Sequence, residues 1–455
     1  MSIPACIESV TLPKKIEVIE SRTFKDCKKL RNIKLPSSVD TIFANAFEGC
    51  TNLKEISLPK KLELLDSSAF SGCKSLKKVD LPKKIKKIGG NPFSGCDKLS
   101  KITLDKSNKR YKVVGNTLFD KSLKRIVLYI PNNKKTTYTV PSNVKEIGKD
   151  AFKGNKNLKT IKMSDSVTSV GTCAFAETTK LRNVKLSNKI TFWGDKAFNK
   201  SNIYNVKSNW KDNILYCDNA VVSCKNKTKI ANVKKGSKYI LSNVFSYSSI
   251  SKLTIPSGVT YIGKSAFEEC NKLTKVDVPN SVTQMNKFAF YDCSSLSKVK
   301  LSDNLTDIPY GAFTFCKSLT KITFPKNLKN IGEEAFFGCE KIPEIILPSK
   351  VEFIDDSAFA NCFNLSKLTL NEGLLGIGAY AFELNKKLKK VTIPKSVFSI
   401  DECALGYLDG GTYFYPPVGD SGENRDDSFK FTVYKGTEGE SYAYYNGFKN
   451  YTVIE

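Results

Sequence analysis

The chain of 455 residues contains no histidine, two tryptophans and three methionines. Without histidine, every catalytic triad with an imidazole base is excluded, and so are most zinc hydrolase designs. The fourteen cysteines include no Cys-x-x-Cys pair, which argues against a structural zinc site. No run of about 18 apolar residues occurs, so the sequence predicts no membrane span. These absences favour a non-enzymatic protein that needs neither a metal nor a cofactor.

What the chain does contain is a phenylalanine that returns every 23 residues over long stretches. We name these residues the ladder phenylalanines: Phe24, Phe47, Phe70, Phe93, Phe152, Phe175, Phe198, Phe267, Phe290, Phe313, Phe336, Phe359 and Phe382. A period of about 20–50 residues indicates stacked repeats. One such unit is too short to bury its own apolar face, so neighbouring units must stack to form a core. This organisation favours an extended binding surface over a catalytic pocket.

Each repeat has a period-two apolar segment and a small-residue segment. After Phe313, Ile322 and Phe324 alternate with polar residues, as in a half-buried strand. Proline stands twelve residues after many ladder phenylalanines and is expected to end this strand, because it cannot donate to a sheet. A Gly or Asp before a short Ala-containing stretch, as in residues 332–336, predicts a single helical turn, so each coil should hold one strand, one or two turns, and a piece of helix or a second short strand. Stacked coils, about 4.8 Å apart, should then form one continuous parallel sheet along one side.

The motif C-x-x-L-x-x-I-x-L-P-x-x-L-x-x-I-G-x-x-A-F resembles the Treponema-type leucine-rich repeat of BspA-like bacterial surface proteins. Strong copies occupy residues 73–89 and 316–336, and the match covers most of residues 1–405. The resemblance implies a leucine-rich-repeat solenoid, a cell-surface or secreted location, and adhesion to host matrix proteins or to other cells. It also implies that residues from about 105 to 140 and from about 203 to 244, where the spacing is lost, are hairpin-like variant repeats.

We expect one solenoid domain over residues 1–405 and a capping segment over residues 406–455. The period is lost in the capping segment, and residues 431–455 predict a strand, a Gly turn, a short helix and a last strand that seals the core. At the other end, residues 7–19 already follow the repeat, and no apolar run of a signal peptide precedes them. We therefore expect that Met1 begins a trimmed chain that has lost its signal peptide and its cap. If Met1 is native, the alternative is a cytoplasmic protein-interaction scaffold.

The formal net charge is +27, and lysine is frequent eight residues after the ladder phenylalanine, at a solvent-facing strand position. We name these residues the lysine column: Lys78, Lys101, Lys275, Lys298, Lys321, Lys367 and Lys390. Stacked like charges repel one another, so this candidate ligand face favours an anionic partner. The plainer alternative is that lysine only solvates a flat sheet and protects it from aggregation.

The expected partner is a protein, an anionic glycan or another anionic surface polymer. Nucleic acid is disfavoured, because few aromatic side chains occur at the outward strand positions on which bases could stack. A monomer is expected. The sequence does not identify the ligand, since the surface of a solenoid is a general one.

Nine of the fourteen cysteines stand three residues after a ladder phenylalanine, and Asn, Ser or Thr takes this position in other repeats. A position shared by these residues requires a small side chain that makes a polar contact to the neighbouring turn. We therefore expect structural thiols there. Cys217 and Cys224, in the second variant segment, leave open a disulfide across a hairpin.

Residues 258–265, GVTYIGKS, match the phosphate-binding pattern G-x-x-x-x-G-K-[ST]. The repeat pattern itself produces this match, because equivalent segments of other repeats read SVTSVGTCAF and SVDTIFANAF. No helix of useful length is expected to follow and present its N-terminus to a phosphate. We interpret the match as a coincidence.

Overall fold

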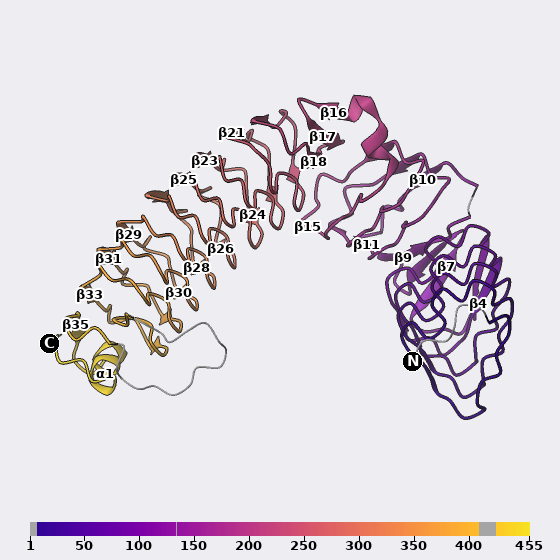
Figure 1. Cartoon of the computed structure of the whole chain (residues 1–455), viewed down its shortest axis with the longest axis horizontal. Helices are drawn as coiled ribbons and strands as arrows, with labels where there is room; N and C mark the ends of the chain where they lie inside the picture. Colours follow the sequence, from indigo (N-terminus) through magenta and orange to yellow (C-terminus); the bar gives the residue numbers. More distant parts are fainter. Residues whose placement is uncertain (1–6, 133, 409–424) are drawn as a thin grey trace. The chain divides into compact units, whose positions relative to one another are not determined.

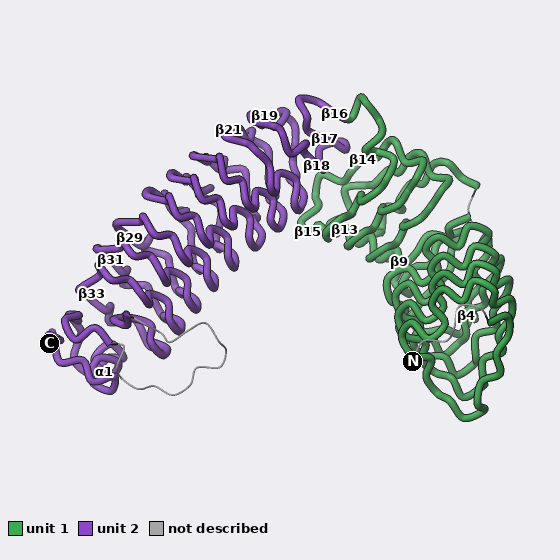
Figure 2. Tube along the Cα trace, in the orientation of Figure 1, with its two compact units in different colours: residues 1–209 green, residues 210–455 purple. Residues whose placement is uncertain are grey.

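The computed structural model describes residues 7–132, 134–408 and 425–455, so the expectation about Met1 and part of the predicted capping segment lie outside the described residues. The chain divides into two compact units, Met1–Asn209 (unit 1) and Trp210–Glu455 (unit 2), shown in Figure 2. Each unit is a stack of short coils (Figure 1). The register between neighbouring coils advances by the sequence repeat, as in Lys298↔Lys321. The predicted leucine-rich-repeat solenoid with 23-residue repeats is confirmed.

Most coils contain two short strands. The first strand begins eight residues after the ladder phenylalanine, and the second is a two-residue strand that ends eighteen residues after it. In the coil of Phe290, the first strand is β25 (Lys298–Lys300) and the second is β26 (Asp307–Ile308). The first strand ends before the proline that follows it in many coils, as predicted. Both strands pair in parallel with the corresponding strands of neighbouring coils.

Unit 1 has these elements. First strands: β4 (Lys78–Leu81), β6 (Lys101–Leu104), β10 (Thr137–Thr139), β12 (Thr160–Lys162) and β14 (Asn183–Lys185). Second strands: β1 (Val18–Ile19), β2 (Thr41–Ile42), β3 (Leu64–Leu65), β5 (Lys87–Ile88), β11 (Glu146–Ile147), β13 (Ser169–Val170) and β15 (Phe192–Trp193). Strands of the variant segment: β7 (Tyr111–Val114), β8 (Thr117–Asp120) and β9 (Arg125–Tyr129). Two 3₁₀ helices follow: η1 (Asn202–Asn205) and η2 (Lys207–Asn209).

Unit 2 has these elements. First strands: β19 (Ile230–Asn232), β21 (Lys252–Thr254), β23 (Lys275–Asp277), β25, β27 (Lys321–Thr323), β29 (Glu344–Ile346), β31 (Lys367–Thr369) and β33 (Lys390–Thr392). Second strands: β20 (Tyr239–Ile240), β22 (Tyr261–Ile262), β24 (Gln284–Met285), β26, β28 (Asn330–Ile331), β30 (Phe353–Ile354), β32 (Gly376–Ile377) and β34 (Ser399–Ile400). The variant segment has β16 (Trp210–Lys211), β17 (Ile214–Cys217) and β18 (Ala220–Cys224). The C-terminal elements are β35 (Lys430–Tyr434), α1 (Glu438–Tyr445) and β36 (Tyr451–Ile454).

The two variant segments are hairpins, as predicted. In unit 1, β7 pairs antiparallel with β8, and β8 pairs antiparallel with β9. In unit 2, β16, β17 and β18 form two consecutive antiparallel pairs. The strands β9 and β18 then pair in parallel with β11 and β20, so each hairpin joins the second-strand sheet of its unit.

The ladder phenylalanines form the centre of the core, as predicted. They are almost completely buried. In unit 2, consecutive rings from Phe245 to Phe382 lie 4.8–5.3 Å apart and 3–9° from parallel. In unit 1, Tyr129 occupies a position of this kind: its N–H donates to Ala151 at 2.8 Å, as that of Phe152 does to Ala174. Tyr129 lies 36 residues after Phe93 and 23 residues before Phe152, so the 23-residue period resumes at Tyr129.

The predicted helical turn around each ladder phenylalanine is wrong. At nearly all of these positions the residues two before and two after the phenylalanine have left-handed backbone, as at Asn45 (φ 61°) and Gly49 (φ 74°) around Phe47. Such residues cannot continue a right-handed helix. The N–H groups of Asn45, Phe47 and Gly49 instead donate to carbonyls of the next coil at 3.1, 2.7 and 2.8 Å. Hydrogen bonds between coils therefore stabilise this backbone, and the local sequence does not reveal them.

The predicted parallel sheet along one side is confirmed, but its first strands form several hydrogen-bonded groups rather than one unbroken ladder. One interruption in unit 2, between β27 and β29, has a clear cause. At the position seven residues after the ladder phenylalanine, the N–H of Thr320 donates to Ser297 at 3.0 Å. Pro343 takes this position in the next coil and has no N–H to donate to Thr320. Its carbonyl still accepts the N–H of Ser366 at 3.0 Å, so pairing resumes one coil later.

The C-terminal residues form the predicted order of strand, Gly turn, helix and strand. Strand β35 pairs in parallel with β33, and β36 pairs with β35, so the first-strand series continues to the end of the chain. Helix α1 presents buried Tyr442, whose hydroxyl contacts both the N–H and the carbonyl oxygen of Leu405 at 3.1 Å. Phe431 and Phe448 pack beside it. Together these side chains cover the last coil.

The cysteines at the repeat position make the polar contact that the sequence predicts. The thiol of Cys316 donates to the carbonyl oxygen of Phe290 in the preceding coil at 3.2 Å, and Asn385 makes the equivalent contact to Phe359 at 3.0 Å. The repeat cysteines from Cys50 to Cys362, together with Cys217 and Cys224, are free thiols. Cys217 lies opposite Ala220 and Cys224 opposite Ile214, so the hairpin register does not make these two cysteines partners.

Residues 258–265 form no phosphate-binding loop. Tyr261 and Ile262 are the buried strand β22, and turns rather than a helix follow them.

Candidate binding surface

All seven residues of the lysine column lie at the first position of a first strand, and all are exposed. Lys78 lies opposite Lys101 in unit 1. In unit 2, Lys298 lies between Lys275 and Lys321 on three adjacent strands. The structure thus brings together two lysines in unit 1 and three in unit 2, while Glu344 stands between Lys321 and Lys367 in the series of first strands.

Carboxylates compensate part of this charge. Lys78 and Lys275 form ion pairs with Asp80 and Asp277, two residues further along the same strand, both at 2.8 Å. The contacts of Lys78 and Thr103 hold the pKa of Asp80 below its ordinary value. Lys367 contacts Glu344 of the neighbouring strand. These pairs are exposed and contribute little stability, but they reduce the positive potential at their coils.

The most positive part of the face lies on β25 and β27. Lys298, Lys300 and Lys321 point outward from these two strands, and within the described part of the chain none of them forms an ion pair. Strands are about 4.8 Å apart, so the backbones of the paired residues Lys298 and Lys321 lie well within one Debye length at physiological salt. An anionic ligand that replaces their counterions would relieve this repulsion.

Two further lysines, Lys252 and Lys430, belong to the same row and are not marked by the spacing of eight residues from a ladder phenylalanine. Lys252 begins β21 but stands seven residues after Phe245, because its coil is one residue shorter. Lys430 begins β35 and lies opposite Lys390. The similarity of Lys-Phe-Thr (430–432) to Lys-Val-Thr (390–392) could have revealed it. Ile346, 56% exposed on β29, also adds an apolar contact to this face.

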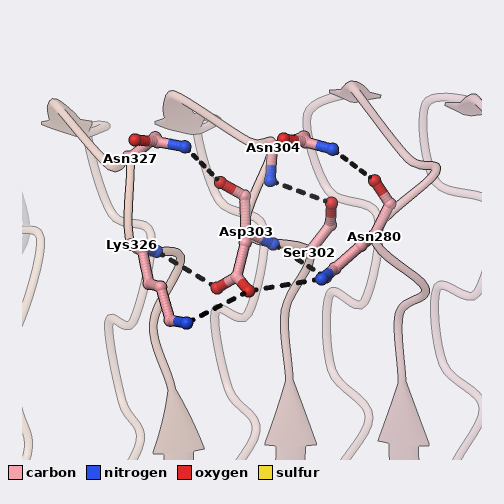
Figure 3. Close-up of polar contacts among 6 residues, drawn as sticks. All are labelled: Asn280, Ser302, Asp303, Asn304, Lys326 and Asn327. Carbon is pink, nitrogen blue, oxygen red and sulfur yellow. Dashed lines mark hydrogen bonds and ion pairs between the residues drawn. The ribbon is translucent and has the colours of Figure 1, made fainter.

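A polar network fixes the turns that follow the first strands (Figure 3). The side-chain amide of Asn304 donates to the carbonyl of Asn280 at 2.6 Å, and that of Asn327 donates to the carbonyl of Asp303 at 3.0 Å. The N–H of Asp303 donates to the side-chain oxygen of Asn280 at 3.0 Å, and that of Lys326 donates to the Asp303 carboxylate at 3.4 Å. Each coil is therefore bonded to the next through side chains as well as backbone. Such a surface loses little conformational freedom when it binds a ligand.

A shallow hollow of about 210 Å³ lies beside the hairpin insert of unit 1. Lys86, Arg110 and Arg125 line it together with Tyr111 and Asp120. Lys86 and Arg125 also form ion pairs with Glu63 and Glu146 at 2.6 and 3.0 Å. No repeat pattern marks this hollow in the sequence, because its arginines belong to the insert and follow no period.

Within residues 7–132, 134–408 and 425–455, no group of three or more Cys, Asp or Glu side chains is arranged to hold a metal ion. The helices in this part of the chain are too short or too polar to cross a membrane.

Comparison with known proteins gives a consistent result. The family described as "BspA type Leucine rich repeat region (6 copies)" matches residues 4–125, 130–235, 238–362 and 306–409. Among solved structures, the chain is similar to a leucine-rich repeat protein from Bacteroides ovatus, with 25% identity over 94% of this chain and 84% of that chain and a TM-score of 0.34. It is similar to a leucine rich cell surface protein from Faecalibacterium prausnitzii, with 25% identity over 79% and 78% of the two chains and a TM-score of 0.32. No curated protein matches.

Proposed function

Since the chain belongs to the BspA-type leucine-rich repeat family, we propose that it is a non-catalytic cell-surface or secreted protein that mediates adhesion. In this proposal it binds a protein or an anionic glycan through its first-strand face. The observation that carries the proposal is the group of Lys298, Lys300 and Lys321, which are exposed on paired strands without an ion-pair partner in the described residues. Extended repeat surfaces bind by contacts distributed over many coils.

The chemistry of the face supports an anionic partner rather than an apolar one. Outward positions of β23, β25 and β27 hold lysine, threonine and aspartate. Among the described residues, the first strands have no exposed aromatic side chain at an outward position on which nucleic-acid bases could stack, so the proposal names a protein or a glycan. We also propose that the protein is a monomer, and that its solenoid domain ends at residue 405 and its capping segment begins at residue 406.

The test uses the intact chain with a sulfated polysaccharide and a panel of matrix proteins. Lys298→Glu combined with Lys321→Glu should weaken binding about tenfold, and binding by the unchanged chain should weaken steeply as salt rises. The matched control is Lys61→Glu with Lys84→Glu, two exposed lysines one repeat apart in the turns of unit 1. It makes the same charge change away from the strands. Salt-insensitive binding, or equal losses in both variants, would reject the lysine face.

A cytoplasmic interaction scaffold is the second candidate. The observation that favours it is the presence of free thiols such as Cys50, Cys217 and Cys316, since intracellular proteins keep thiols reduced. Fractionation of the native host cell distinguishes the two candidates: surface exposure to added protease supports adhesion, and complete protection supports the scaffold.

A further inference from the structure

In unit 2, the turns around the ladder phenylalanines carry a second row of aromatic side chains. We name Phe288, Tyr291, Tyr310 and Phe315 the aromatic edge. All four are half-buried. Consecutive rings make edge-to-face contacts, with centroids 4.8 Å apart for Phe288–Tyr310, 5.5 Å for Phe288–Tyr291 and 5.8 Å for Tyr291–Phe315. These aromatics lie outside the core ladder and leave part of each ring open to solvent.

Two glycines hold the rings of this edge in place. Gly311 has φ +60°, and a Cβ added there would lie 2.5 Å from the ring of Phe288. Gly338 has φ +69°, and a Cβ there would lie 2.7 Å from the ring of Phe315. Each ring therefore covers the glycine backbone of the next coil. The edge is a preformed surface rather than a set of free side chains.

Carboxylates surround the aromatic edge. Glu268, Glu269, Asp292, Glu333 and Glu334 occupy the same turns, and among the described residues none of them has a cation within ion-pair distance. Burial raises the pKa of Asp292 and of Glu334 above the ordinary values. Tyr247, 57% exposed, contacts Glu268 through its hydroxyl at 3.4 Å. The edge thus combines open ring faces with negative charge that no lysine or arginine of the described chain neutralises by direct contact.

The corresponding turns of unit 1 have a different chemistry. From four residues before to two residues after its ladder phenylalanines, unit 1 holds acidic and basic residues in nearly equal number: Glu20, Asp26, Glu48, Asp66, Asp150, Glu177 and Asp195 with Arg22, Lys25, Lys149, Lys153, Lys196 and Lys200. From Phe267 to Phe382, unit 2 holds mostly acids: Glu268, Glu269, Asp292, Glu333, Glu334, Asp355, Asp356 and Glu383 with Lys264 and Lys287. The acidic, aromatic character is therefore particular to unit 2 and is not a requirement of the repeat.

We propose that the aromatic edge of unit 2 binds a lysine- or arginine-rich segment of a partner protein. A cation is attracted to the open face of an aromatic ring and to neighbouring carboxylates at once. Neighbouring rings lie at steep angles to one another, so they do not form the flat platform on which sugars or bases stack. The site lies in the turns, apart from the lysine column, and requires a partner of the opposite charge.

Fluorescence anisotropy with a short labelled peptide in which arginine alternates with glycine tests this proposal on the intact chain. The chain as a whole is positive and repels such a peptide, so binding at low salt would identify a local acidic site. Glu268→Gln with Glu269→Gln and Glu334→Gln should weaken binding about tenfold, and Phe315→Leu should weaken it several-fold. The matched control replaces Glu20, Glu48 and Glu177 of unit 1 by glutamine and should leave binding unchanged.

Each other outcome overturns the proposal. No binding at low salt, or equal weakening by the unit 1 control, would reject the aromatic edge as a cation site. Binding of a neutral glycan that Phe315→Leu abolishes, without binding of the peptide, would assign the edge to carbohydrate. Self-association in sedimentation velocity that the unit 2 glutamine variant abolishes, again without peptide binding, would assign it to a second copy of the chain. Lys298→Glu with Lys321→Glu should not weaken peptide binding, which separates this test from that of the proposed function.

Discussion

Aromatic rings stack along the core of both units, but the stacking is more regular in unit 2 than in unit 1. In unit 1, the ring pairs Phe24–Phe47 and Phe47–Phe70 lie 1–9° from parallel, but those that flank the insert are tilted by 16–30°. In unit 2, the hairpin lies before the first stacked ring, and six consecutive pairs stay within 9°. An irregular hairpin therefore disturbs the core when it interrupts the stack and leaves it undisturbed when it precedes the stack.

The largest expected effect comes from removing one core ring in each unit. Phe313→Ala and Phe47→Ala should each lower the free energy of unfolding by about 3–5 kcal/mol, because each deletes a fully buried ring between two stacked neighbours. Hydrogen exchange should show that amides near Phe313 lose protection while those of residues 24–93 keep it. Chemical denaturation followed by circular dichroism measures the change in the free energy of unfolding for the whole chain.

The reverse pattern is expected for Phe47→Ala, with the loss confined to unit 1. If either substitution lowered the amide protection of both units equally, the two units would unfold as one cooperative unit. Their stabilities could then not be compared separately.

A smaller effect is expected at the thiol position. Cys316→Ala removes a hydrogen bond to the Phe290 carbonyl and should cost about 1–2 kcal/mol. In unit 1, Ser201 holds the equivalent position, and its buried hydroxyl has no hydrogen-bond partner among the residues that the structure describes. Ser201→Cys should place a thiol toward the carbonyl of Phe175 and stabilise unit 1 by up to about 1 kcal/mol. Thermal unfolding of both variants tests this difference, and a destabilising Ser201→Cys would contradict it.

The smallest effect concerns alkaline pH. Burial raises the pKa of Cys50, in unit 1, and of Cys362, in unit 2, to about 12. In the unfolded chain these thiols ionise near their ordinary pKa, so their contribution to stability is complete below pH 9 and declines as pH rises toward about 12. Native-state alkylation at mildly alkaline pH should accordingly modify half-buried Cys173 and spare Cys50 and Cys362.

Mass spectrometry of the alkylated peptides measures how far Cys50, Cys173 and Cys362 are labelled. Urea-unfolded protein is the control, in which all three thiols should react. Equal labelling of Cys50 and Cys173 in the folded chain would contradict the burial on which this prediction depends.

The sequence predicted the coil, its core and the position of the lysine column, because these depend on periods that side chains record directly. It predicted a helical turn where the backbone is left-handed, since positions such as Asn45 and Lys196 are not glycine and only hydrogen bonds between coils stabilise them. The sequence pattern did not reveal that Tyr129 belongs to the row of core rings. A tyrosine stands there in place of the ladder phenylalanine, and the position lies inside an insert. The ion pair of Lys367 with Glu344 was missed because pairing between strands depends on the register of two coils.

The left-handed positions have a consequence for how such a chain can evolve. A non-glycine residue in this conformation costs roughly 1–2 kcal/mol, yet Phe288, Glu334 and Tyr380 all adopt it. Because inter-coil bonds impose the geometry, a mutation there changes the outward side chain without altering the coil beneath it. New binding specificities can therefore arise by substitution in one coil at a time. Duplication or loss of a whole repeat instead changes the length of the solenoid.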